Sequence, residues 1–211
     1  MKKDIKIVAL NMYDTWIDMR IKNNPYKKLF YKLGIQENIK ELSKILQTTS
    51  RDIKDILPQK SLEREDIDLL LKQFNEDIQK QIQSILIYDD FIPTIDFLKK
   101  NGYQTAVISN LSKLYAYPVT HGEGKGKFDY EILSFDVGEI KPNIGIFQEL
   151  QNKSGVDPSK VIMVGDSFVS DVKGSHNAGV YPIYLERSSK GIQDNGRYTK
   201  ISSLEDLKEI L

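Results

Sequence analysis

The sequence contains no cysteine among its 211 residues. Disulfide bonds, thiolate catalysis and cysteine-bound zinc are therefore excluded, which is compatible with a reducing cytosol. Net charge is also absent, because 30 basic residues balance 30 acidic ones, and no overall field would attract nucleic acid or an anionic membrane. Long hydrophobic runs are lacking too, since the first run, Ile5 to Leu10, is too short for a signal peptide or a membrane span. We therefore expect a cytoplasmic protein that binds neither nucleic acid nor a membrane.

What is present is the composition of a folded globular protein, with 40% hydrophobic and 28% charged residues. Short apolar runs without a polar face, typical of strands buried on both sides, occur at residues 5–10, 105–108, 132–135, 161–164 and 181–185. Helix-like stretches lie between them at residues 93–100, 144–153, 170–178 and 203–210. This alternation predicts an α/β fold with a Rossmann-like parallel sheet covered on both faces.

Residues 18–86 interrupt this rhythm. They show no strand-like run but several amphipathic helical patterns, including Pro25 to Leu33, Asn38 to Leu46 and Leu62 to Ile85. The segment begins directly after the first predicted strand. We therefore predict two domains: an α/β core made of residues 1–17 and 87–211, and an inserted helical cap made of residues 18–86.

Polar residues follow the predicted strands at the ends where parallel sheets bind ligands. They are Asn11 and Tyr13 after the first strand, Ser109 and Asn110 after the second, Lys141 after the third, and Asp166 and Asp171 after the fourth. A hydroxyl and an ammonium can together hold phosphate oxygens, and two carboxylates can bind a hard cation such as Mg²⁺. Each fragment alone is more often a turn, a loop or a helix cap. Their order on successive strand ends favours a phosphate and magnesium site.

The chain resembles the haloacid dehalogenase-like hydrolases over nearly its whole length. Ser109 matches the second motif of that superfamily, Lys141 the third, and the segment from Gly165-Asp166 to Asp171 the fourth. The helical insertion stands where one class of members carries its cap. The resemblance implies Ser109, Asn110 and Lys141 as phosphate ligands, with Lys141 also catalytic.

The first motif departs from the family pattern, Asp-x-Asp-Gly-Thr, whose first Asp attacks phosphorus and whose second moves a proton. Aligned on Thr15, this chain has Asn11 at the nucleophile position, Tyr13 at the acid/base position and Asp14 at the glycine. The alternative register places Met12 at the nucleophile position and is worse. An amide has no ionised form with which to attack. Tyr13, a phenol with a pKa of about 10, is expected to hydrogen bond or pack instead.

The leading interpretation is a scaffold related to small-molecule phosphatases, inactive or impaired because Asn11 replaces the Asp nucleophile. Other interpretations are an engineered trap at Asn11, a non-catalytic binder of a small phosphorylated or carboxylated molecule, and a 2-haloacid dehalogenase-like enzyme, since dehalogenases carry Tyr where Tyr13 stands. The resemblance also implies Mg²⁺ held by Asp166, Asp171 and Asn11. We expect this cation to bind more weakly than in an intact member, because an amide oxygen is a neutral ligand.

Overall fold

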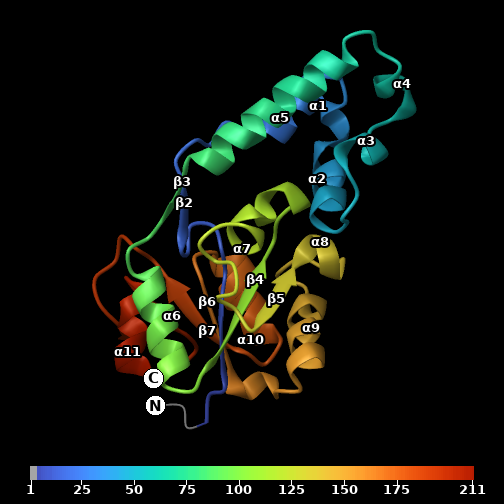
Figure 1. Cartoon of the computed structure of the whole chain (residues 1–211). Coiled ribbons are helices and arrows are strands. Elements are labelled where there is room, and N and C mark those ends of the chain that lie inside the picture. Colours follow the sequence, from blue (N-terminus) through green and yellow to red (C-terminus); the bar gives the residue numbers. More distant parts are fainter. Residues whose placement is uncertain (1–3) are drawn as a thin grey trace.

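A seven-stranded sheet forms the centre of the computed structural model, which describes residues 4–211 (Figure 1). Its strands are β1 (Ile7–Leu10), β4 (Gln104–Ser109), β5 (Tyr130–Leu133), β6 (Val161–Gly165), β7 (Tyr181–Leu185), β8 (Gln193–Asp194) and β9 (Thr199–Ile201). They lie in the order β5-β4-β1-β6-β7-β9-β8, and all neighbouring pairs are parallel except β8 with β9. The predicted α/β fold with a parallel sheet is confirmed.

Helices cover both faces of the sheet, as strand β1 illustrates. Val8 and Leu10 point into a core that includes Phe91 of helix α6. Ile7 and Ala9 point to the opposite face and join a core that includes Phe147 of helix α9. Because β1 buries both rows of its side chains, its sequence is continuously apolar rather than alternating. The helices associated with the core are α6 (Phe91–Lys100), α7 (Tyr117–Thr120), α8 (Ser134–Val137), α9 (Ile144–Ser154), α10 (Gly174–Asn177) and α11 (Leu207–Ile210).

The segment between β2 (Ile17–Met19) and β3 (Ile85–Ile87) is helical, and we call it the helical insertion. Its helices are α1 (Pro25–Lys32), α2 (Ile39–Gln47), α3 (Ile53–Ile56), α4 (Gln59–Leu62) and α5 (Ile67–Gln83). Apolar residues such as Leu29, Phe30 and Phe74 form a core of its own. In Figure 1 these helices lie beyond one end of the sheet and are connected to it through β2 and β3. Among residues 4–211, no helix has the length and apolar character needed to cross a membrane.

Three sequence expectations about strands need correction. The predicted absence of strands between residues 18 and 86 is wrong at its edges, because β2 and β3 pair antiparallel with Met19 opposite Ile85. The predicted strand at 132–135 is too long, because β5 ends at Leu133 and Ser134 begins α8. Strands β8 and β9 were not predicted at all. Such short strands owe their conformation to a partner strand more than to a hydrophobic pattern of their own.

Asp90 anchors the end of the insertion to the core. Its carboxylate receives two hydrogen bonds from Arg187, at 2.8 and 3.1 Å, and others from Ser203 Oγ and the Leu204 N–H. Arg187 also donates to the carbonyl of Thr15 and stacks its guanidinium 3.7 Å from the centre of the Tyr88 ring. The Arg187 side chain thereby links the loop after β1 to the segment that follows β3.

Asp90→Asn should destabilise the protein by about 1–3 kcal/mol at neutral pH, because the partly buried Arg187 loses a charged acceptor. Burial acts to raise the pKa of Asp90, but the hydrogen bonds from Arg187, Leu204 and Ser203 together hold it below its usual value. A lowered folded-state pKa gives stability that is complete above the unfolded-state pKa and is lost as the pH falls through the folded-state value. The difference in unfolding free energy between the unmodified chain and Asp90→Asn, measured by urea unfolding, should therefore become smaller below about pH 4.

The exposed Asp96 on α6 supplies the matched control, Asp96→Asn, which should leave the unfolding free energy nearly unchanged at every pH. A constant difference between Asp90→Asn and the unmodified chain from pH 7 to pH 3 would contradict the role given to the Asp90 charge.

Candidate functional site

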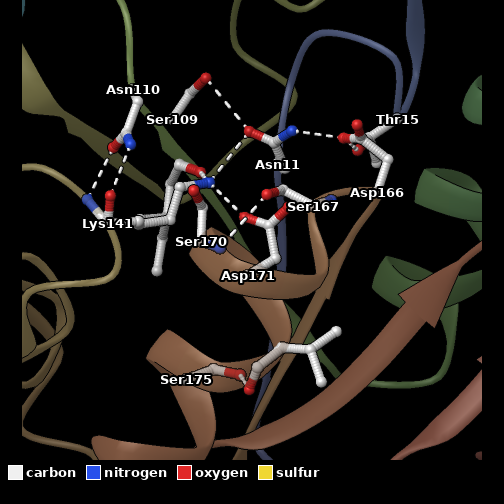
Figure 2. A network of polar contacts seen from close by, with 12 residues as sticks. Asn11, Thr15, Ser109, Asn110, Lys141, Asp166, Ser167, Ser170, Asp171 and Ser175 are labelled. Atoms are coloured by element: carbon white, nitrogen blue, oxygen red, sulfur yellow. Dashed lines mark hydrogen bonds and ion pairs between the residues drawn. The ribbon is translucent and has the colours of Figure 1, made fainter.

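The central strands β4, β1 and β6 are neighbours, and their carboxyl ends bring the predicted site residues together (Figure 2). Asn11 follows β1, Ser109 ends β4, and Asp166 follows β6. Asp171 lies on the short π-helical segment Phe168–Lys173, and Lys141 reaches in from the loop between α8 and α9. The sequence expectation that these side chains lie at one edge of the sheet agrees with this geometry.

Asn11 is the meeting point of the network. Its Oδ1 accepts hydrogen bonds from Lys141 Nζ at 3.0 Å and from Ser109 Oγ at 3.3 Å. Its Nδ2 donates to Asp166 Oδ1 at 2.8 Å and to the carbonyl of Tyr13 at 3.0 Å. The amide therefore connects the basic half of the site to the acidic half.

Lys141 and Asp171 form a fully buried ion pair, with side chains 2% and 0% exposed and 2.6 Å between Nζ and Oδ1. Lys141 Nζ also donates to the carbonyl of Ile108, and Asp171 Oδ2 accepts from the N–H of Ser167 at 2.9 Å. Gly165 allows the Asp171 side chain to lie against the backbone of β6, because a Cβ at position 165 would be 2.2 Å from Asp171 Oδ2. The ammonium is therefore held at a set position beneath Asn11.

Asn110 holds the loop that carries Lys141. Its Nδ2 donates to the carbonyl of Lys141 and its Oδ1 accepts from the N–H of Lys141, both at 2.8 Å. Both polar atoms of the Asn110 side chain therefore form hydrogen bonds with the backbone of Lys141, and this geometry gives Asn110 a role in positioning Lys141. Direct phosphate binding by Asn110, expected from the sequence, stays a prediction.

The turn after β1 distinguishes the two registers considered for the first motif. Met12 is completely buried in the apolar core, whereas Asn11 faces the site. Asp14 points away, is exposed, and pairs with Lys22 at 3.0 Å. It adopts a left-handed conformation with φ of 57°, which Asp tolerates better than most residues. The backbone thus has, at Asp14, the conformation that a glycine would adopt readily.

Tyr13 is held away from proton transfer. Its hydroxyl donates to the carbonyl of Tyr115 at 2.8 Å, and burial raises its pKa further above the usual tyrosine value. It stays protonated at neutral pH with its proton engaged. The expectation that Tyr13 hydrogen bonds and packs agrees with these contacts.

Asp166 lies in a less polar environment than an ordinary surface carboxylate. Burial, and then the nearby charge of Asp171, raise its pKa, while hydrogen bonds from Asn11 and Thr15 act in the opposite direction. Thr15 Oγ1 donates to the same Oδ1 atom at 3.0 Å. This oxygen therefore already accepts two hydrogen bonds.

Tyr115 and Gln81 were missed by sequence reasoning. The Tyr115 hydroxyl donates to Gln81 Oε1 on helix α5, and Gln81 Nε2 donates to the carbonyl of Ile21. Together with Tyr13 and Tyr26 they line a pocket of about 370 Å³ between the core and the helical insertion. Gln81 is only 3% exposed, and the signal that the sequence offered is a glutamine in line with the apolar face of an amphipathic helix, which includes Phe74 and Ile78.

Comparisons with known proteins agree with this architecture. A family model described as haloacid dehalogenase-like hydrolase matches residues 19–184, a span that begins after the first motif. A glyceraldehyde 3-phosphate phosphatase from Methanothermobacter thermautotrophicus is 35% identical over 130 residues, which cover 56% of this chain and 55% of that protein. The chain therefore spans about half the length of this curated relative.

Two solved structures match almost the whole chain. A HAD phosphatase from Thermococcus onnurineus has a TM-score of 0.65 at 25% identity, covering 98% of this chain and 97% of that one. A 2-haloacid dehalogenase from Pseudomonas syringae pv. Tomato DC3000 has a TM-score of 0.72 at 21% identity, covering 98% and 97%. The second likeness shows the fold alone.

The chain belongs to the haloacid dehalogenase-like hydrolases. Its relatives by sequence include phosphatases, and the resemblance found in its motifs is confirmed at the level of the family.

Proposed function

We propose that this protein is a phosphatase-like scaffold that binds a small phosphorylated molecule at the strand-end site and does not hydrolyse it at an ordinary enzymatic rate. Ser109 and Lys141 would receive the phosphoryl group, with Asn110 holding Lys141 in place. The helical insertion would act as the cap over the ligand, and its residues would determine the ligand specificity.

The position of Asn11 carries this proposal. Lys141 and Ser109 both converge on its Oδ1, where the resembling family has the oxygen that attacks phosphorus. A neutral amide oxygen already accepting from a lysine is a poor nucleophile, and covalent catalysis requires an activated one. Neither nearby carboxylate offers a substitute, because Asp171 is paired with Lys141 and Asp166 accepts from Asn11 and Thr15.

The chemistry of the remaining groups favours binding. Positioning and charge stabilisation by hydroxyl and ammonium groups are a large part of how proteins handle phosphoryl groups. The relatives named for glyceraldehyde 3-phosphate and phosphoglycolate support a small phosphorylated ligand, and a carboxylated one would use the same donors. A dehalogenase reaction is less well supported, since it too would need a nucleophile where Asn11 stands.

A turnover and trapping experiment on the unmodified chain tests this function. With an aryl phosphate in excess, we expect no phospho-enzyme by intact-mass spectrometry and no turnover above a heat-denatured control. Peptide mass spectrometry of the same sample must show that Asn11 has not deamidated to Asp, because that change would create the missing nucleophile. An ordinary enzymatic rate from undeamidated protein, abolished by Ser109→Ala, would overturn the proposal.

A further inference from the structure

The orientation of the Asn11 amide is determined by its neighbours. On one side stands Lys141 Nζ, which can only donate hydrogen bonds; on the other stand Asp166 Oδ1 and the Tyr13 carbonyl, whose oxygens accept them. Reversing the amide would set its NH₂ group against the ammonium and its oxygen against two other oxygens. The NH₂ group therefore faces the acidic half of the site (Figure 2).

Most of the oxygens that could hold a cation already accept hydrogen bonds, and Asp166 Oδ2 is the exception. The Tyr13 carbonyl and Asp166 Oδ1 both accept hydrogen bonds from Asn11 Nδ2, and Asp166 Oδ1 also accepts one from Thr15 Oγ1. Both oxygens of Asp171 are occupied as well, one by Lys141 and the other by the N–H of Ser167. Mg²⁺ requires a near-octahedral set of oxygen ligands. Within residues 4–211, no group of three or more acidic, histidine or cysteine side chains is placed to hold a metal ion, so a cation here would depend on these few oxygens and on water.

The Asn11 oxygen does not help to complete a metal site. The sequence expectation was that this oxygen would serve as a weak neutral ligand, but it points to Lys141 and Ser109 rather than to Asp166. A cation between Tyr13 and Asp166 would instead meet the amide NH₂ group, which has no lone pair available for coordination. The donor set present does not fit Mg²⁺.

We propose that the Asn11 NH₂ group takes the place of a divalent cation, so that this site is assembled and stable without metal. It joins the Tyr13 carbonyl to Asp166, and the amide adds no negative charge for a cation to offset. This inference goes beyond the proposed function, which concerns the missing nucleophile. A chain could bind Mg²⁺ tightly and still fail to attack a phosphate.

Thermal unfolding with Mg²⁺ and with EDTA tests the inference without any activity measurement. The unmodified chain should unfold at the same temperature in both. Asn11→Asp places a second carboxylate against Asp166, so this variant should unfold at a lower temperature in EDTA than in Mg²⁺, because the two charges repel when no cation lies between them. Mg²⁺ at about a hundredfold excess over its Kd should then raise that temperature by on the order of 5 °C or more.

Asn152→Asp is the matched control, because it adds the same charge on the exposed face of α9 and should respond to Mg²⁺ as the unmodified chain does. Titration calorimetry with Mg²⁺ gives a second readout. Saturable binding to undeamidated starting protein, removed by Asp166→Asn, would overturn the inference. So would an Asn11→Asp variant whose affinity for Mg²⁺ is no greater than that of the unmodified chain. Hydrolysis of an aryl phosphate by the unmodified chain in EDTA would instead sink the proposed function and leave this inference standing.

Discussion

The double variant Asn11→Asp/Tyr13→Asp should hydrolyse an aryl phosphate on the order of 10²–10⁴-fold faster than Asn11→Asp alone, with Mg²⁺ present. The single change restores a carboxylate beside Ser109 and Lys141, where the family places its nucleophile. It leaves Tyr13 unable to move a proton, because its hydroxyl donates to the carbonyl of Tyr115 and burial raises its pKa. A shorter carboxylate at that position would supply the missing acid and base.

The measurement is the ratio of kcat/KM between the two variants across pH. The double variant should show a pH profile with an added ionisation, which mere repacking around Tyr13 would not produce. Tyr13→Phe in the Asn11→Asp background is the control, since it removes the hydroxyl without adding an acid, and its rate should stay close to that of Asn11→Asp. If the double variant is no faster than this control, position 13 is not the acid/base position. Asp14 should not limit either variant, because its backbone already has the left-handed conformation.

Lys141→Met should destabilise the fold by about 3–5 kcal/mol, the largest stability effect expected from any single change in this site. Asp171 is 0% exposed and lies 2.6 Å from the ammonium, so removing Lys141 leaves a carboxylate without its partner in a place that water does not reach. The carbonyl of Ile108 loses a donor at the same time. Urea unfolding at neutral pH measures the difference.

Two further variants make this result specific. Lys141→Met/Asp171→Asn removes the stranded charge and should recover part of the lost stability. Lys200→Met breaks a pair of similar length, 3.0 Å from Glu186, but with side chains 24% and 37% exposed, and should lower stability by less than about 1 kcal/mol. Equal losses from Lys141→Met and Lys200→Met would show that burial does not set the energy of the Lys141 pair.

The parts of the fold that could be predicted are those whose signal lies within a short stretch of the sequence. Strand β1 is buried on both faces, so its apolar run identifies it without knowledge of its neighbours. The residue that follows such a run then lies at the ligand-binding edge, which is why Asn11, Ser109 and Asp166 could be assigned to one site. Parallel sheets make this step possible because successive strands point the same way.

The parts that escaped prediction depend on partners far away in the chain. Strands β2 and β3 are three residues each and are strands only because they pair with one another. The Tyr13 hydroxyl donates to the Tyr115 carbonyl, and the Tyr115 hydroxyl donates to the Gln81 side chain; these bonds join three separate segments that no spacing in the sequence relates. The direction of the Asn11 amide follows from four neighbouring groups, which only the folded arrangement brings together.

The pairing of β2 with β3 also bears on how such a protein could acquire its insertion. Because Met19 lies opposite Ile85, the chain leaves the core and returns to it at adjacent points, about 5 Å apart as in any sheet. A tight two-residue hairpin could bridge the same gap. The β2–β3 pair is therefore a site where insertions can be exchanged. A segment of any length could replace the helices there without moving a strand of the core, provided that its two ends are one strand spacing apart. Under the proposed function, ligand choice could then change in the exchanged segment while Asn11 and its neighbours keep their arrangement.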